Sequence, residues 1–468
     1  MEGGQREKWS SKIGLIFAAA GSAVGLGNIW RFPYMTGEYG GSAFIIIYLG
    51  CVLLIGLSIM IAEWTIGRSS NLESASAFKK VNKNWTFAGF LGVLAAFLIL
   101  GFYPVVGGWS LAYIFKSVTG LLSSPDIGGE FGAFVSSDLQ PLFWMAIYLV
   151  INIAIVSKGV SKGIEKASKI MMPAILVLFI LVSIRGLTLS GASAGLEYIF
   201  KPDWSEVNGQ TFLAALGQAF FSMSLGMGIM ITYGSYIPKE GKIPNSAALV
   251  TLLDTGVALL AAVAIFPALF AFGMEPSDGA GLVFMVLPAV FAEMGTFGPV
   301  FSVIFFPALT LAALTSSMSL LEVVVAYLMD EKKLTRKKAV IGTGIILVVM
   351  NIISSLSMGL LSDFTIFGVI VFDFFDFITD KVFLAIAGML SAVFVGWVLK
   401  KEDVKKELSN GGTVKFALFE AWYFLVKFVI PIAVAIVALV GITSLEQRSL
   451  AIFGVAVVVA LGVFSKKL

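Results

Sequence analysis

A stretch near the start of the chain places polar and helix-breaking residues inside an apolar segment. The sequence GSAVGLGNIWRFPY (21–34) contains three glycines and a proline, which are poor helix formers, together with Asn28 and Arg31, which are costly in lipid. An unpaired N–H or C=O group in hydrocarbon costs several kcal/mol, so irregular backbone at membrane depth is expected only where it is buried in protein or lines a cavity. The stretch therefore predicts one half of a binding site.

A later apolar segment is interrupted in the same way. The sequence GQAFFSMSLGMGIMITYGSY (217–236) carries Ser222, Ser224, Gly226 and Gly228 near its middle. Glycines of this kind also serve as close-packing surfaces between membrane helices. Because polar side chains accompany the glycines in both segments, we favour two discontinuous helices whose freed main-chain groups form a site at the membrane midplane.

Polar side chains also lie in two further apolar segments. Asp254 stands within LVTLLDTGVALL, and an isolated carboxylate there must be protonated or face a cation. We favour the cation, because oxygen-rich neighbours are available. Thr315, Ser316 and Ser317 bring three hydroxyls together, although such hydroxyls also bond back to a carbonyl one turn earlier.

The available groups suit a zwitterion and a monovalent cation. Carbonyl, hydroxyl and carboxylate oxygens are the ligands of hard cations such as Na⁺. A carboxylate is stabilised at the N-terminal end of a half-helix, and an ammonium group at the carbonyls of a C-terminal end. Together these requirements describe an amino acid, whose side chain would contact Ile99, Phe102, Tyr103, Phe221 and Met227.

The composition is that of a polytopic membrane protein. Of the 468 residues, 58% are hydrophobic and only 13% are charged. Apolar segments predict twelve spans, at 13–38, 41–65, 86–115, 142–157, 170–186, 209–237, 246–272, 298–328, 338–357, 375–399, 423–442 and 449–464. Lys and Arg crowd alternate loops, which places these loops and both termini in the cytosol and requires an even number of spans.

Other features limit the chemistry. The single cysteine, Cys51, excludes an internal disulfide, and the absence of histidine removes the usual proton relay and metal ligand. Glu63 is expected to accept hydrogen bonds from freed backbone N–H groups, whereas the sequence suggests no partner for Glu322. Residues 273–297 are expected to contain a short external helix that acts as a lid, and 163–173 a cytosolic segment that unwinds.

With these motifs in place, the chain resembles the neurotransmitter:sodium symporters, in their bacterial amino-acid branch. The matching motifs are GSAVGLGNIWRFPY, the third-span GFYPVVGGW, the sixth-span SLGMG and the eighth-span LTSS. The resemblance implies one all-α membrane domain (1–468) of twelve transmembrane helices with broken helices 1 and 6. Its two five-helix inverted repeats would cover 10–186 and 209–400, and two additional helices 415–468. It also implies sodium-driven uptake of a neutral amino acid by alternating access.

The resemblance also assigns residues to sites. Two Na⁺ ions are implied. The first would bind the Ala23 carbonyl, the substrate carboxylate and the side chains of Asn28, Ser222 and Asp254. The second would bind the carbonyls of Gly21, Val24 and Ala312 and the hydroxyls of Thr315 and Ser316. The substrate site would contain Ser22, Ala23, Gly25, Leu26, Gly27, Ile99, Tyr103, Phe221, Ser222, Ser224, Met227, Ser316 and Leu320.

Two gates are implied in the same way. The outer gate would join Arg31 to Asp373 or Asp376 in the tenth span, and the sequence leaves that choice open. The inner gate would pair Arg6 with Asp330, beside Trp9 and Tyr236.

Several functional expectations follow. Many relatives carry a neutral Asn where this chain has Asp254, so we expect a fixed carboxylate to replace chloride, with Ala258 offering no acid one turn later. Met227 and its flanking glycines favour a large hydrophobic or aromatic substrate. The alternative function is a proton-coupled or sodium-independent permease of the same architecture, with Asp254 or Glu322 carrying the proton.

The remaining function classes and partners are excluded or limited. An enzyme is disfavoured, because the sequence contains no nucleophile–base pair, metal cluster or phosphate loop. The basic residues follow the cytosolic membrane face and do not form a nucleic-acid-binding domain. The lipid bilayer is the expected surrounding, and no obligate protein partner is evident. External loops without cysteine or glycosylation acceptors favour a bacterial inner membrane, with both termini cytoplasmic.

Overall fold

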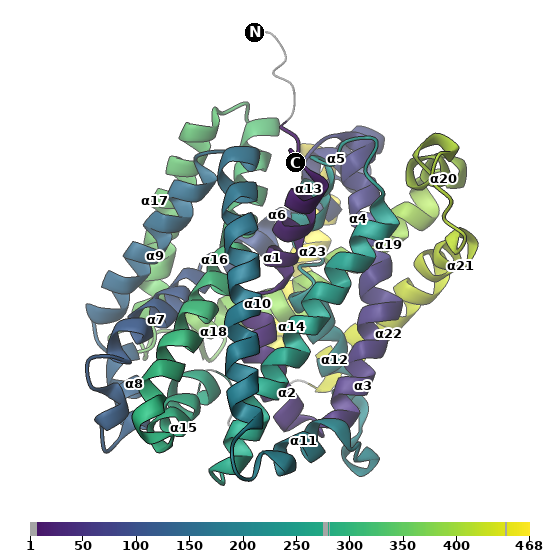
Figure 1. Cartoon of the computed structure of the whole chain (residues 1–468). Helices are drawn as coiled ribbons and strands as arrows, with labels where there is room; N and C mark the ends of the chain where they lie inside the picture. Colours follow the sequence, from purple (N-terminus) through teal and green to yellow (C-terminus); the bar gives the residue numbers. More distant parts are fainter. Residues whose placement is uncertain (1–6, 275–278, 280, 445–446) are drawn as a thin grey trace.

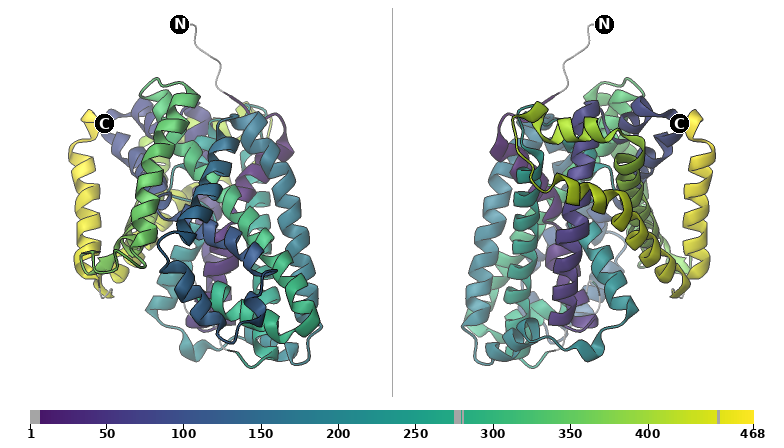
Figure 2. Two further views of the ribbon diagram at one scale, coloured as in Figure 1. Left: turned by 90° about the vertical axis from the view of Figure 1, so that its left-hand side faces the viewer. Right: turned by 90° about the vertical axis from the view of Figure 1, so that its right-hand side faces the viewer.

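The computed structural model describes residues 7–274, 279, 281–444 and 447–468, the side chains of 441–444 excepted. Long helices run alongside one another, and the first described residues and the C-terminus lie at the same end of the bundle (Figures 1 and 2). We call this the terminal end. Helices α8, α11 and α15 lie at the opposite end (Figure 1). The placement of the first described residues and the C-terminus at one end agrees with an even number of spans.

The described residues form helices almost throughout. The α-helices are α1 (Lys12–Ala23), α2 (Phe32–Glu38), α3 (Ser42–Cys51), α4 (Leu57–Ser70), α5 (Ser74–Val81), α6 (Thr86–Ile99), α7 (Tyr103–Lys116), α8 (Ile127–Val135), α9 (Gln140–Val156), α10 (Lys166–Leu187), α11 (Ala192–Phe200), α12 (Gly209–Ser222), α13 (Ile229–Gly234), α14 (Ile243–Ala271), α15 (Leu287–Glu293), α16 (Gly298–Asp330), α17 (Arg336–Leu356), α18 (Val371–Phe377), α19 (Leu384–Val393), α20 (Lys401–Leu408), α21 (Phe419–Phe424), α22 (Ile430–Ser444) and α23 (Arg448–Val463). Turns of π-helix are Gly27–Arg31, Val52–Gly56, Val160–Glu165, Leu282–Val286, Ile378–Phe383, Phe394–Val398 and Leu425–Val429. Short 3₁₀ turns are Lys83–Trp85, Leu121–Ser123, Trp204–Glu206, Gly295–Phe297, Asn410–Gly412 and Ser465–Lys467.

Length and composition identify fewer spans than the sequence predicts. Among the described residues, 8 helices are long and apolar enough to cross a membrane. The number rises to at most 10 if two helices that are joined by a sharp bend are counted as one span. The predicted sixth span does not count, because α12 and α13 are separated by a break, and α23 is short, with 16 residues. A multi-pass membrane protein is therefore confirmed, but the number twelve is not.

The first span is broken, as predicted. Helix α1 ends at Ala23, and Val24 has an extended backbone (φ −72°, ψ 96°). The chain becomes helical again at Gly27, and the two parts of the span are bent by 49°. Pro33 lies near the start of α2, which continues directly from the π-helical turn Gly27–Arg31. The break therefore lies between Ala23 and Gly27, ahead of this proline.

The sixth span is broken as well. Helix α12 ends at Ser222 and α13 begins at Ile229. Between them, Ser224, Gly226 and Gly228 have φ angles of 55°, 73° and 71°, in the left-handed region that an α-helix cannot contain. The break is thus fixed by backbone conformation.

Glu63 holds this second break in place. Its Oε1 atom accepts a hydrogen bond from the N–H group of Gly226 at 3.0 Å, and the side chain is fully buried on α4. The expectation that Glu63 satisfies freed backbone is confirmed. The Glu63 carboxylate therefore accepts the hydrogen bond from Gly226 that a main-chain carbonyl would accept in a continuous helix.

Gly226→Ala is expected to lower the free energy of unfolding by at least about 1–3 kcal/mol, the cost of a strained left-handed residue. An added Cβ would also lie 2.2 Å from the Leu384 carbonyl oxygen, which is backbone and cannot turn away. The matched control is Gly217→Ala in α12, where a Cβ meets nothing within 4 Å. Thermal unfolding of both variants in detergent checks this; equal midpoints would contradict it.

Three other segments either differ from the sequence predictions or agree with them. The all-α prediction misses a two-stranded hairpin, β1 (Thr365–Ile366) and β2 (Val369–Ile370), whose turn residues Phe367 and Gly368 both have positive φ. Residues 160–187 are helical throughout, so the expected unwinding is absent from this conformation. Residues 282–293 form the expected short helix, while 275–278 and 280 lie outside the described residues.

Candidate functional site

A small cavity lies between the two helix breaks. It is lined by Ser22, Ala23, Gly25, Gly27, Ile99, Tyr103, Phe221, Ser224, Met227, Ile229, Ser316 and Leu320. The centre of a water molecule can occupy only about 20 Å³ of it, which is room for about one water molecule. The walls therefore lie close together in this conformation.

The cavity brings together most of the residues predicted for the substrate site. All of them line it except Leu26 and Ser222. The N–H group of Leu26 donates to the Tyr103 hydroxyl at 3.3 Å, so it borders the cavity. Ile229 is the residue that the sequence analysis missed, although its place directly after Gly228 at the start of α13 was a usable signal.

Ser22 links three helices at one wall of the cavity. Its carbonyl oxygen accepts from the Ser224 hydroxyl and from the Ser316 hydroxyl, both at 2.9 Å. The Ser22 hydroxyl also donates to Ser224 at 3.1 Å. Both helix breaks and α16 are thus joined through one main-chain group.

Asp254 forms a buried polar cluster beside the cavity. The Asn28 amide donates to Asp254 Oδ1 at 2.7 Å and to the Ser222 hydroxyl at 3.1 Å. Ser222 in turn donates to the carboxylate at 2.9 Å, and Tyr48 donates to Ser222 at 3.3 Å. All four side chains are fully buried. Three elements therefore converge on one carboxylate that has only neutral partners among the described side chains.

A second group of oxygens lies where α16 passes the first break. Thr315 Oγ1 donates to the Ala312 carbonyl at 2.9 Å, so the back-bonding alternative holds for this hydroxyl. A Cβ on Gly21 would lie 3.2 Å from Thr315, which shows that the two residues face each other closely. Val24, the residue after the last of α1, has the extended backbone of the first break.

The donor types in both groups fit a sodium ion. Carboxylate, hydroxyl, amide and main-chain oxygens are present, and hard cations prefer such a set. In this conformation the Asn28 Oδ1 atom accepts from the Gly25 N–H group at 3.1 Å, so the amide oxygen is already directed into the first break. The chemistry of the residues thus agrees with the predicted ligands.

Arg31 pairs in this conformation with an acid that the predicted outer gate did not include. Arg31 Nη2 lies 2.6 Å from Asp380 Oδ2, with the two side chains only 10% and 4% exposed. The sequence predicts Asp373 or Asp376 as the partner of Arg31. These acids lie on α18, and all three share one helix face at spacings of one and two turns, so spacing alone cannot choose among them.

A second, wider cavity adjoins the small cavity between the helix breaks. It has a volume of about 260 Å³, and Arg31, Asp373 and Asp376 line it together with Trp30, Phe102 and Phe221. The guanidinium carbon of Arg31 lies 5.0 Å from the centre of the Phe221 ring. Arg31 and Phe221 therefore belong to the partition between this cavity and the small one. Phe102, which was expected to contact the substrate, lines only the wider cavity.

The predicted inner gate is described only in part, because Arg6 lies outside the described residues. Trp9 donates from its backbone N–H to Tyr236 and from its indole to the Tyr233 carbonyl, both at 3.1 Å. Asp330 accepts from the N–H group of Glu73 at 3.0 Å. Trp9 and Tyr236 therefore lie together, as expected.

Glu322 has partners that the sequence did not reveal. Arg336 binds it with two nitrogens, at 2.6 and 3.0 Å, and the Tyr236 hydroxyl donates to it at 2.7 Å. Arg336 also lies 3.1 Å from Glu7. A bidentate guanidinium–carboxylate pair thus connects the N-terminal segment, the residues after α13, α16 and α17.

Glu73 is a buried acid between two membrane spans, at the start of α5. Burial raises the pKa of its carboxyl from 4.5 to about 7, although its hydrogen bonds with Ser76 and Ala75 oppose the change. Between these values the native state binds more protons than the unfolded state. The free energy of unfolding should therefore fall as the pH rises through this window, by at most about 1.4 kcal/mol per pH unit.

Glu73→Gln is expected to flatten this pH dependence, because the amide keeps an oxygen for the cap and does not titrate. Unfolding midpoints measured over a pH series in the wild type and the variant check the prediction. Parallel profiles would contradict it.

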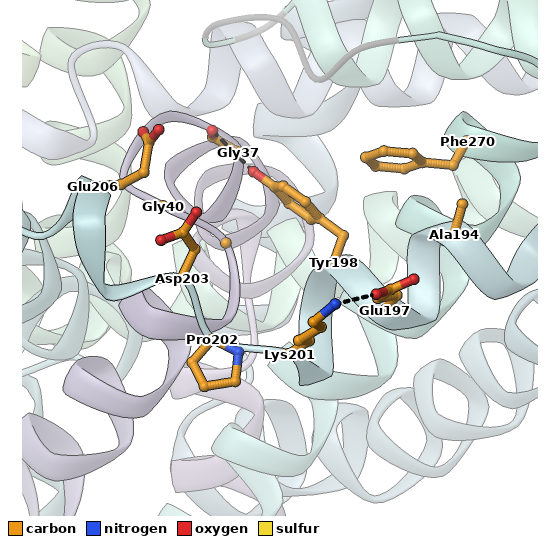
Figure 3. Close-up of a pocket in the computed structure, with 11 residues that line it drawn as sticks. Gly37, Gly40, Ala194, Glu197, Tyr198, Lys201, Pro202, Asp203, Glu206 and Phe270 are labelled. Atoms are coloured by element: carbon orange, nitrogen blue, oxygen red, sulfur yellow. Dashed lines mark hydrogen bonds and ion pairs between the residues drawn. The ribbon is translucent and has the colours of Figure 1, made fainter.

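A larger cavity elsewhere contains none of these residues. It measures about 580 Å³ and is lined by α11 and its neighbours (Figure 3). Lys201 lies 2.7 Å from Glu197, and Tyr198 donates to the Gly37 carbonyl at 3.1 Å (Figure 3). The polar clusters lie at the helix breaks and not in this larger cavity. We therefore do not assign the larger cavity as the functional site, despite its size.

Comparison with known proteins agrees with this geometry. The model of the sodium:neurotransmitter symporter family matches residues 6–130 and 137–461. An uncharacterized sodium-dependent transporter, YhdH of Bacillus subtilis (strain 168), is 41% identical over 446 residues, or 93% of this chain and 98% of the relative. Another, from Methanocaldococcus jannaschii, is 33% identical over 455 residues, or 92% and 89%.

A solved structure is also similar. The crystal structure of MhsT in complex with L-phenylalanine is 47% identical in sequence and covers 93% of this chain and 99% of its own, with a TM-score of 0.86. Sequence and fold thus agree over the same length of chain. The protein belongs to the sodium:neurotransmitter symporter family, and it is a membrane transporter and not an enzyme.

Proposed function

We propose that this protein is a sodium-coupled symporter that takes up neutral, hydrophobic or aromatic L-amino acids by alternating access. The observation that carries the proposal is the small cavity between two broken helices, with the Asp254 cluster beside it. The similarity to MhsT, solved with L-phenylalanine, and to relatives named sodium-dependent transporters supports the substrate class and the ion.

The substrate would lie with its carboxylate at the N–H groups of Leu26 and Gly27 and the Tyr103 hydroxyl. Its ammonium group would contact oxygens of Ala23, Phe221, Ser222 and Ser224, and its side chain the wall that contains Ile99, Met227 and Leu320. The cavity must widen to accept an aromatic side chain, because it now holds about one water molecule. Movement of Phe221 and Met227 would supply that space.

Two sodium ions would bind beside the substrate. The first would use Ala23, Asn28, Ser222 and Asp254, together with the substrate carboxylate, so that ion and substrate share a contact. The second would use Gly21, Val24, Ala312, Thr315 and Ser316. The hydrogen bonds that join Ser22 to Ser224 and Ser316 support coupling between the two regions.

Alternating access would use the two ends of the bundle in turn. Arg31 and Asp380 would close the outer path. Trp9, Tyr236 and the Glu322–Arg336 pair, with Arg6 and Asp330, would close the inner one. The two five-helix repeats, residues 10–186 and 209–400, would supply the moving and static parts, in a bacterial inner membrane with both termini in the cytosol.

A proton-coupled permease is the second candidate, because Asp254 is buried among neutral partners and could carry a proton. Uptake of labelled L-phenylalanine into proteoliposomes separates the two. A sodium gradient should drive accumulation that choline cannot support, and an inward proton gradient alone should not drive it. Accumulation driven by an inward proton gradient in choline medium would favour the proton-coupled permease.

Transport is expected to be independent of chloride, because the Asp254 carboxylate supplies a fixed negative charge beside the first sodium site. Replacing chloride by gluconate on both sides of the proteoliposome membrane should leave the initial rate of sodium-driven uptake unchanged. A collapse of uptake in gluconate would overturn this part of the proposal. A thermal-shift panel of amino acids with and without sodium identifies the substrate.

A further inference from the structure

Lys427 is a lysine within a lipid-facing span. The span Phe419–Val440 has 22 residues, and only 22% of its most apolar window is buried inside the protein. Helices α20 and α21 lie on the face turned to the viewer in the right-hand view of Figure 2. The surroundings of Lys427 are therefore protein on one side and the bilayer on the other.

Aromatic rings surround the ammonium group of Lys427. Its Nζ atom lies 4.6 Å from the centre of the Trp397 ring, 5.6 Å from Phe428 and 5.9 Å from Tyr423. The Trp397 indole donates to the Lys427 carbonyl at 2.8 Å, which holds the two residues together. These contacts orient the ammonium group, but cation–π attraction alone does not neutralise its charge.

The neighbouring lysines have acidic partners, whereas Lys427 has none among the described residues. Glu420 lies 2.6 Å from Lys401 and 3.6 Å from Lys405. No described carboxylate lies within 4.0 Å of the Lys427 nitrogen. A half-buried cation at a membrane surface thus lacks a counter-ion from the protein.

The contact with Trp397 places Lys427 beside the end of the span Val371–Val398. Trp397 stands one residue before the end of its helix, and Lys400 and Lys401 follow directly. Tryptophan prefers the membrane–water interface, and lysine extends its apolar stem along the surface to bring its charge there. Both side chains therefore place the ammonium group where lipid phosphates lie.

We propose that Lys427 and Trp397 form a binding site for the headgroup of an anionic phospholipid. The lipid phosphate is the missing counter-ion of Lys427. The acyl chains lie along α21 and α22, over Phe424, Phe428 and Ile432, which are 56%, 40% and 60% exposed. This lipid site depends on the protein lying in a membrane, and it does not depend on which substrate the protein transports.

Lipid titration of the delipidated full-length protein, followed by native mass spectrometry, tests the proposal. Phosphatidylglycerol should bind with a defined stoichiometry that phosphatidylcholine does not reproduce. Lys427→Gln should weaken phosphatidylglycerol binding about fivefold, the contribution of one basic residue near an anionic surface. Lys427→Arg should retain binding. The matched control, Lys201→Gln, removes an exposed lysine paired with Glu197 and should have no effect.

Three results would overturn the proposal. The first is equal binding of the two lipids by the wild type, a measurement that needs no variant. The second is unchanged phosphatidylglycerol binding by a folded Lys427→Gln variant. The third is full displacement of the lipid by inorganic phosphate at equal concentration, which would make the site one for a free anion.

Discussion

Sodium-stimulated amino-acid binding is expected to disappear when Asn28 is replaced by alanine. The substitution removes the donor to Asp254 and Ser222 and the acceptor for the Gly25 N–H group, all of them buried. Each buried polar group left without a partner costs about 1–3 kcal/mol, which is roughly 5–150-fold in an equilibrium constant. A sodium titration of labelled L-phenylalanine binding to the purified protein measures the loss.

Two further variants make this result specific. Asn84→Ala changes an exposed amide in the 3₁₀ turn Lys83–Trp85 and should leave the sodium titration unchanged. Thr315→Ala removes a hydroxyl at the second group of oxygens and should also abolish the sodium response. Normal titrations in both Asn28→Ala and Thr315→Ala would count against the assigned sodium sites.

Asp380→Asn is expected to hold the transporter open on the side of the wider cavity. In the closed arrangement Arg31 and Asp380 form a buried pair, and removing one partner of such a pair costs about 3–5 kcal/mol. In the open arrangement water would surround Arg31, so the penalty falls on the closed state alone. The equilibrium should then shift by at least about 100-fold, and uptake should fall much more than substrate binding.

Cysteine labelling measures this shift, because Cys51 is the only native cysteine. Met358 lines the wider cavity, so Met358→Cys in a Cys51→Ala background reports its access to a membrane-impermeant maleimide. Labelling should be faster with Asp380→Asn, and Asp376→Asn should have a smaller effect. Adding Arg31→Gln to Asp380→Asn should restore part of the closure. Equal labelling in the two single variants would contradict the assignment of the gate acid to Asp380.

Both helix breaks could be predicted because their causes are local. Glycine and polar residues in an apolar run oppose a continuous helix wherever the run is placed. The partner of Glu63 followed from the same reasoning, since a freed N–H group in the membrane needs an acceptor. The convergence of Asn28, Ser222 and Asp254 needed the family resemblance, because the three residues lie on three separate helices.

Other features depend on details that a sequence does not carry. Asp373, Asp376 and Asp380 occupy one helix face, and the tertiary packing around Arg31 selects the last of them. Glu322 meets Arg336 only because the turn after α16 returns the chain beside it. The hairpin at Phe367 uses a non-glycine residue at positive φ, which no local pattern announces.

The contacts of Trp9 tie the first described residues to the far side of the sixth span. Helix α13 has only 6 residues, too short to persist without tertiary support, and Trp9 bonds to the carbonyls of both Tyr233 and Tyr236. Removing the chain up to and including this tryptophan would therefore loosen a segment more than 200 positions away, since the two residues joined by the indole bond are 224 positions apart in the sequence. A truncation that removes Trp9 is consequently expected to disturb the proposed inner gate and not the N-terminal segment alone.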